Sequence, residues 1–110
     1  MNIEGKLNEL NDLISSEADS EFTYQWEDEN NDKLIINFLL RNKSYRYEFN
    51  LHNMDLIKVV DNEIEYQKNV KNEDEGFDII EKDIHEILNI SEHFIIRSFH
   101  KFNESFNNGI

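Results

Sequence analysis

The sequence predicts an α+β domain in which helices cover an antiparallel sheet. The first residues carry apolar side chains at helical spacing, residues 22–51 alternate between apolar and polar side chains, and the last third returns to helical spacing. Amphipathic helices and half-buried strands each need an apolar surface to pack against, so the helices must cover at least one face of the sheet. We expect 110 residues to form a single domain, 1–110, because a second core would have too few residues.

An N-terminal helix is predicted over residues 3–17. Its apolar side chains recur at intervals of three and four residues and therefore lie on one face. These side chains are Ile3, Leu7, Leu10 and Ile14, with Leu13 beside them.

Three strands are predicted next. Residues 22–26 alternate as a half-buried strand does, and residues 45–51 do the same. Residues 33–41 between them are almost continuously apolar, as expected of a central strand covered on both faces. A short turn at 42–43 then joins the second and third strands, and the three strands form an antiparallel meander.

The middle of the chain allows two interpretations. Residues 55–68 resemble two short strands around a hairpin turn at Asp61-Asn62, which would extend the sheet to five strands. A helix over 54–60 is the alternative. Residues 69–76 are predicted to be a charged loop.

The last third predicts two C-terminal helices packed on the sheet. The first covers residues 77–89 and the second starts after Ser91, a suitable N-cap residue. Their apolar stripes consist of Phe77, Ile80, Ile84, Ile87 and Leu88 in the first helix, and Ile95, Phe99, Phe102 and Phe106 in the second.

The sequence offers little for catalysis or cofactor binding. It has no cysteine and three scattered glycines, so it contains no thiolate nucleophile and no phosphate-binding glycine loop. The histidines His93 and His100 are two helical turns apart, too far to share a metal ion, and are interpreted as solvated helix surface. We therefore expect a protein that is not an enzyme and that has no cofactor and no metal. With no secretory signal or membrane span in the sequence, we expect it in the cytoplasm.

The net charge of −13 points to the class of partner. Nucleic-acid backbones and anionic membranes would be repelled, so we expect neither as a direct ligand. Acidic side chains crowd into one predicted turn and into a predicted loop with the helix start that follows it. They are either a solubilising surface or an array that imitates nucleic-acid phosphates and binds a basic protein. These candidate partner-binding residues are Glu27, Asp28, Glu29, Asp32, Glu73, Asp74, Glu75 and Asp78.

The chain resembles small acidic phage anti-CRISPR inhibitors of Cas9. The resemblance consists of size, acidity, a Met1-Asn2-Ile3 start that leads into a helix, and the order helix, three strands, two helices. It implies a stoichiometric inhibitor that occludes a nucleic-acid-handling protein. Independently of the resemblance, we expect exposed aromatics such as Tyr24, Trp26 or Tyr66 to anchor the partner. This chain is longer, chiefly through residues 55–72, and no functional residue carries over.

Two other functions fit the same sequence. A bacterial immunity protein that neutralises a cognate nuclease toxin has the same size and charge. An oligomeric, chaperone-like adaptor would use the Phe-rich final helix as its interface. Whether the protein is a monomer or a dimer is left open by the sequence.

Overall fold

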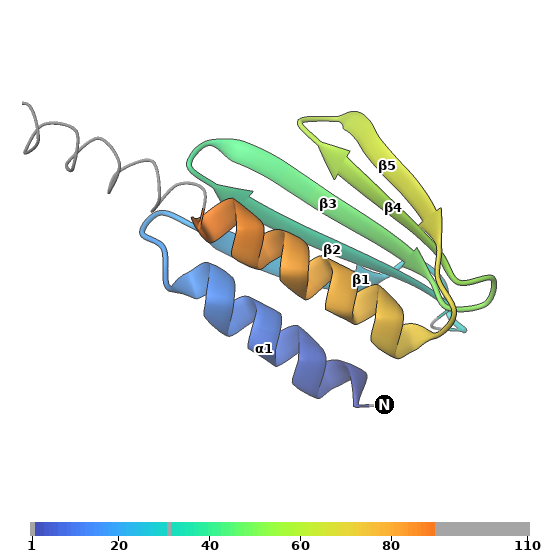
Figure 1. The fold of residues 1–110 in the computed structure, drawn as a ribbon. Coiled ribbons are helices and arrows are strands. Elements are labelled where there is room, and N and C mark those ends of the chain that lie inside the picture. Colours follow the sequence, from blue (N-terminus) through green and yellow to red (C-terminus); the bar gives the residue numbers. More distant parts are fainter. Residues whose placement is uncertain (1, 31, 90–110) are drawn as a thin grey trace, which may run out of the picture.

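The computed structural model describes residues 2–30 and 32–89, which form an α+β domain, as predicted (Figure 1). Its elements are α1 (Ile3–Ser15), β1 (Glu21–Trp26), β2 (Lys33–Leu40), β3 (Lys43–Asn50), β4 (Asp55–Val60), β5 (Glu63–Asn69) and a helix over residues 73–89. The second predicted C-terminal helix, after Ser91, lies outside the described residues.

The five strands form one antiparallel sheet in the order β1-β2-β3-β4-β5. The predicted three-strand meander is confirmed. The hairpin interpretation of residues 55–68 is also confirmed, and the helix over 54–60 is wrong, because β4 pairs with both β3 and β5. β2 lies between β1 and β3, as predicted for the central strand of the meander, and β3 is the middle strand of the five.

Two-residue turns close the β2–β3 and β4–β5 hairpins. Arg41 and Asn42 both have positive φ in the first turn, and Asp61 and Asn62 do so in the second. This backbone matches the right-handed twist of the flanking strands, and Asn and Asp tolerate it better than most residues. The first turn was predicted one residue too late, because Lys43 already pairs with Leu40 in the sheet.

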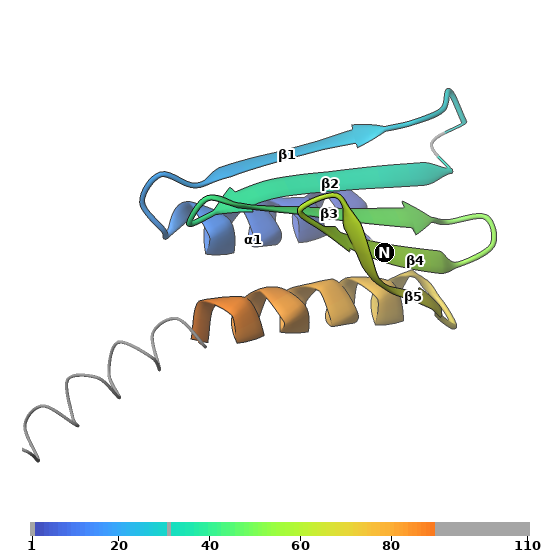
Figure 2. The ribbon, with the colours of Figure 1, turned by 90° about the horizontal axis from the view of Figure 1, so that it is seen from above.

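Both helices lie on one face of the sheet, side by side and running in the same direction (Figure 2). The core between the layers is formed mainly by Leu7, Leu10 and Ile14 of α1, by Leu34, Ile36, Phe38, Tyr47, Phe49 and Leu56 of the sheet, and by Phe77, Ile80 and Ile84 of the second helix.

Residues 33–41 were predicted to be covered on both faces of the sheet. In the described part of the chain, helices cover one face only. Ile35 is buried on the other face, where its cross-strand neighbours are Gln25 and Glu48. Ile35 is therefore flanked by polar side chains of the adjacent strands, and among residues 2–30 and 32–89 no helix covers it on that face.

The second helix begins at residue 73, whereas the sequence predicted a loop up to residue 76. Asn72 caps the helix, because its side-chain oxygen accepts a hydrogen bond from the backbone N–H of Glu75 at 2.9 Å. The Glu75 carboxylate accepts one from the backbone N–H of Lys71 at 2.7 Å. The polar first turn concealed this start, since the apolar stripe begins only at Phe77. α1 ends at Ser15, slightly before the predicted end at residue 17.

Within residues 2–30 and 32–89, no helix has the length and apolarity needed to cross a membrane.

Candidate partner-binding surface

The two acidic clusters predicted from the sequence lie at the same end of the domain. The turn after β1 holds the first, and the start of the second helix holds the second (Figure 1). Backbone hydrogen bonds join both regions to the β3–β4 turn, from Leu51 N–H to Asp32 C=O at 2.6 Å and from Val70 N–H to Met54 C=O at 2.9 Å. We call this region the acidic end; it comprises Glu27, Asp28, Glu29, Asp32, Glu73, Asp74, Glu75 and Asp78.

Within the acidic end, the two clusters belong to different layers of the domain. The first lies in the β1–β2 turn of the sheet, and the second lies at the start of the helix that packs on the sheet (Figure 2). The first turns of this helix approach β3, where Gly76 lies against Phe49. A partner that contacts both clusters must therefore bridge the sheet layer and the helix layer.

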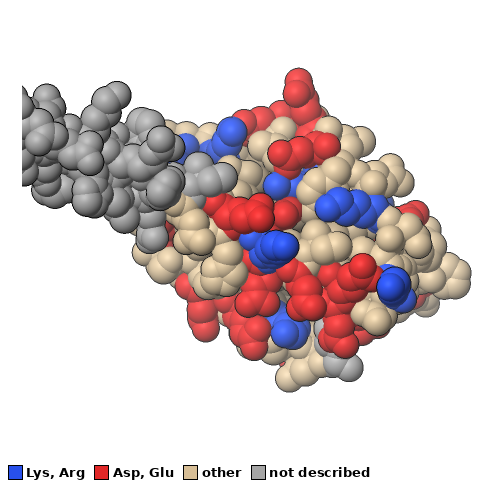
Figure 3. Space-filling model, viewed as in Figure 1, with Lys and Arg blue, Asp and Glu red and all other residues tan. Residues whose placement is uncertain are grey.

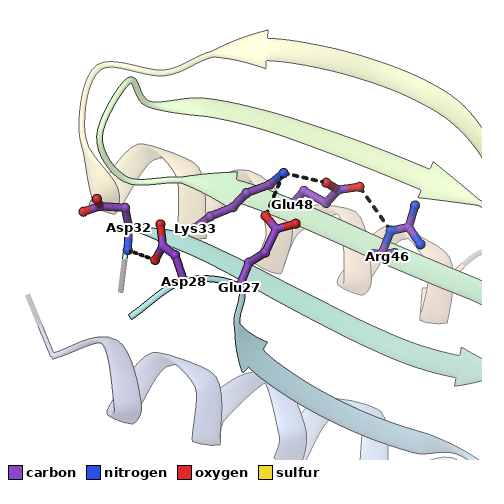
Figure 4. Close-up of polar contacts among 6 residues, drawn as sticks. All are labelled: Glu27, Asp28, Asp32, Lys33, Arg46 and Glu48. Atoms are coloured by element: carbon purple, nitrogen blue, oxygen red, sulfur yellow. Dashed lines mark hydrogen bonds and ion pairs between the residues drawn. The ribbon is translucent and has the colours of Figure 1, made fainter. Parts of the chain in front are cut away.

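Glu27 is neutralised within the protein. Its carboxylate lies 3.0 Å from the Lys33 ammonium, which also contacts Glu48 at 3.2 Å, and Glu48 in turn pairs with Arg46 at 3.2 Å (Figure 4). Hydrogen bonds from Lys33 to Glu27 and then to Glu48 raise the pKa of the lysine, and burial acts against them. Two acids and two bases alternate in this chain of contacts, so Glu27 contributes little free charge to the acidic end.

Asp28 and Asp32 shape the turn between β1 and β2. The Asp28 carboxylate accepts a hydrogen bond from the backbone N–H of Asp32 at 2.9 Å (Figure 4). Glu29 is exposed, and its carboxylate has no ion pair or hydrogen bond with any other described residue. Of the first cluster, Glu29 is therefore the carboxylate best placed to meet a partner.

The second cluster likewise combines a carboxylate that is bonded within the protein with others that are not. Glu75 caps the helix, whereas Asp74 and Asp78 are exposed and Glu73 is half-buried. None of these last three makes an ion pair inside the described ranges. Acidic side chains in a first turn are stabilised by the unpaired N–H groups of the helix end, which offsets part of their mutual repulsion.

The three proposed aromatic anchors differ in exposure. Tyr24 is 42% exposed, whereas Trp26 and Tyr66 are half-buried against the core. The Tyr66 hydroxyl donates a hydrogen bond to Asp83 at 2.5 Å, so the expectation that Tyr66 is an exposed anchor is wrong. Tyr24 remains the aromatic side chain of this set that a partner could reach.

A buried polar network between the sheet and the second helix was missed by the sequence analysis. Lys58 is only 8% exposed, and its ammonium contacts Glu65 at 2.6 Å and Asp83 at 3.4 Å. Asp83 also accepts hydrogen bonds from the hydroxyls of Tyr47, at 2.9 Å, and Tyr66. The alternation of Leu56, Lys58 and Val60 along one strand was the available signal, because it places the lysine on the core face.

Burial is the main reason that the pKa values of Tyr47 and Tyr66 are raised well above the ordinary value for tyrosine, and the neighbouring Asp83 adds to both shifts. Both phenols therefore stay protonated and act as donors. The charges and hydrogen-bonding groups of this network find their partners within it. We therefore interpret the network as the contact that sets the position of the second helix on the sheet, and not as a reactive centre.

The helix-covered face of the molecule is predominantly acidic (Figure 3). Asp and Glu side chains are distributed over both helices there, with Lys and Arg side chains interspersed. Acidity is thus not confined to the acidic end. Exposed carboxylates without an ion pair in the described ranges also occur elsewhere, for example Asp12, Glu63 and Glu86, whereas at the acidic end Glu29, Asp74 and Asp78 belong to two clusters of acidic side chains.

Comparison of the chain with protein-family models, with curated proteins and with solved structures gave no significant match.

Proposed function

We propose that this protein is a stoichiometric inhibitor that binds a basic, nucleic-acid-handling protein and occludes its nucleic-acid site. The observation that carries this proposal is the set of exposed carboxylates Glu29, Asp74 and Asp78 at one end of a domain of net charge −13. They make no ion pair within the described parts of the chain, so their charge is available to a partner.

The mechanism is electrostatic occlusion. Carboxylates at the acidic end steer the protein to a basic groove and pair there with Arg and Lys side chains that otherwise contact phosphates. Charge complementarity of this kind raises association rates to about 10⁸ M⁻¹s⁻¹ or more at low salt. Tyr24, on the strand that leads into the acidic end, supplies a partly exposed aromatic contact.

The proposal is tested by charge reversal with a matched control. One variant changes Glu29, Asp74 and Asp78 to lysine, and the control changes Asp12, Glu63 and Glu86, which are exposed acids outside the acidic end. Both variants have the same net charge, so general electrostatic attraction affects them equally. We expect only the first variant to lose binding to its partner.

The assay uses purified basic nucleases, among them a CRISPR effector nuclease and a toxin nuclease domain, each bound to fluorescently labelled nucleic acid. The wild-type protein should displace the nucleic acid at a one-to-one ratio. Displacement should weaken between 50 and 500 mM salt, as the screening length falls from about 14 Å to about 4 Å. A ternary complex with nucleic acid, or equal loss of binding in both variants, would refute occlusion through the acidic end.

The class of nuclease that binds separates anti-defence activity from toxin immunity. Displacement from the CRISPR effector indicates the first, and displacement from the toxin domain indicates the second. Failure to bind any nuclease of the panel would contradict the proposal in both forms.

A further inference from the structure

The end of the domain opposite the acidic end contains a pocket of about 350 Å³. It lies where the β2–β3 turn, the end of β4, the start of β5 and the last turns of the second helix meet (Figure 1). Its walls combine basic, acidic and aliphatic side chains, namely Leu40, Arg41, Lys43, Tyr45, Lys58, Val60, Glu65 and Ile87.

Three of the chain's basic side chains converge on this pocket. Arg41 pairs with Glu17 at 2.9 Å, and Lys58 pairs with Glu65 and Asp83. Lys43 is exposed and makes no ion pair in the portion of the chain that the structure describes. An anion in the pocket would therefore gain the uncompensated charge of Lys43, whereas the charges of Arg41 and Lys58 are already balanced by their carboxylate partners.

Tyr45 supplies an unused hydrogen-bond donor at the pocket wall. The residue is only 8% exposed, and its ring stacks on Phe38 with the centroids 4.8 Å apart, which fixes its orientation. Its hydroxyl has no hydrogen-bond partner among residues 2–30 and 32–89, unlike the hydroxyls of Tyr47 and Tyr66. Burial raises the pKa of Tyr45, so the hydroxyl is protonated at neutral pH and can donate.

The hydroxyl oxygen reaches solvent at the pocket, because no buried side-chain nitrogen or oxygen among the described residues lacks a hydrogen-bond partner, and it can therefore bond to water or to a ligand. The acceptor that this site favours is anionic, because the unpaired ammonium of Lys43 adds charge attraction to the hydrogen bond from Tyr45. The aliphatic side chains of Leu40, Val60 and Ile87 line the same pocket and suit an apolar group.

We propose that this pocket binds a small organic anion, with its anionic oxygens held by Lys43 and Tyr45 and its apolar part against Leu40, Val60 and Ile87. The site lies away from the acidic end and does not depend on the inhibitor function proposed above. Carboxylates and phosphate monoesters share the required chemistry, and the experiment separates them.

The test is a titration of the full-length, ¹⁵N-labelled protein by two-dimensional NMR. Benzoate and phenyl phosphate are the probes, and benzamide is the uncharged control of similar shape. We expect saturable shifts in the amide signals of residues 40–45 and 58–65, with at least one anion binding about tenfold or more tightly than benzamide, as loss of a charge-assisted hydrogen bond predicts. The tighter of the two anions identifies the preferred headgroup.

Two variants locate the binding groups. Tyr45→Phe removes the hydroxyl and keeps the stacked ring, and Lys43→Gln removes an exposed charge that no fold contact requires. Each should weaken binding of the tighter anion about tenfold. Lys71→Gln is the matched control, because it makes the same charge change on an exposed lysine at the other end of the domain. It should bind as the wild type does.

The proposal is overturned by the absence of saturable shifts in the full chain, or by equal affinity of the Lys43→Gln and Lys71→Gln proteins. Equal affinity would mean that anions respond to overall charge and not to a site. Should Tyr45→Phe lower the melting temperature, the exposed Lys43→Gln variant decides the outcome alone.

Discussion

Gly76, in the first turns of the second helix, lies directly against the aromatic ring of Phe49 on β3. A Cβ atom at Gly76 would overlap ring atoms of Phe49, whose side chain is fully buried. Glycine is therefore required here by the close approach of helix and sheet, and not by an unusual backbone angle, since no glycine among the described residues has positive φ.

Gly76→Ala should destabilise the protein by about 1–3 kcal/mol, because the added methyl group forces the helix away from the sheet. Gly5→Ala in α1 is the comparison, since a Cβ there would meet only the exposed side chain of Asn2, the N-cap residue that accepts a hydrogen bond from the Gly5 N–H. That change should stay within about 1 kcal/mol of the wild type, because alanine favours the helix. Urea unfolding measures both, and a Gly76→Ala protein as stable as wild type would show that the two layers are farther apart.

Asp83→Ala should lower the free energy of unfolding by about 3 kcal/mol, because it leaves Tyr47 and Tyr66 without their acceptor and removes one carboxylate from Lys58. Glu81→Ala serves for comparison. Its carboxylate contacts His85 at 3.8 Å on the same helix, and the loss should be below about 0.5 kcal/mol. Similar midpoints of chemical denaturation for the two variants would argue against a structural role for the network.

Stability should fall at alkaline pH. The pKa of Tyr47 is raised by burial in the folded protein, whereas the unfolded chain has the ordinary value of 10.0. Above that pH the unfolded state releases a proton that the folded state retains. The contribution of the Tyr47 hydroxyl to the free energy of unfolding is therefore complete below pH 10 and declines as pH rises. The decline should be about 1.4 kcal/mol per pH unit for this tyrosine. Unfolding curves at increasing pH would show a shallower decline for Tyr47→Phe, and an unchanged slope would contradict the burial of this hydroxyl.

Charge reversal at the start of the second helix should have effects that differ between neighbouring acids. The sequence alone suggested that changing Glu73, Asp74 and Glu75 to lysine would leave stability unchanged or slightly raised. Glu75 caps the helix, so Glu75→Ala should cost about 1 kcal/mol. Asp78→Ala should cost less than about 0.5 kcal/mol, because this side chain is exposed and makes no described contact. Thermal unfolding distinguishes them, and equal melting temperatures would exclude the capping role.

The sheet was predictable because its signals are local. Alternation in β1 and β3, and Asn or Asp residues at both two-residue turns, identify strands and hairpins without knowledge of the rest of the fold. The start of the second helix was not predictable from its apolar stripe, because its first residues are held by a cap and by contact with Phe49.

The sequence was sufficient to locate the acidic residues of the candidate site, but not to tell which of their carboxylates are unpaired in the folded protein. Glu27 and Glu29 look equivalent in the sequence, yet strand register brings Lys33 beside Glu27 and leaves Glu29 exposed. Asp74 and Glu75 differ in the same way, because only Glu75 reaches back to the backbone before the helix. Which carboxylate is free depends on contacts that form only in the folded chain.

The meander order of the strands has a consequence for the order of events during synthesis. Each strand pairs only with its neighbours along the chain, so every hairpin can form as soon as its two strands leave the ribosome. The helix over residues 73–89 is made after β5, and until it docks Phe49 and Tyr47 lack one of the two helices that cover the sheet face. A chain that is truncated or cleaved after β5 would therefore expose an apolar sheet surface and be prone to aggregation.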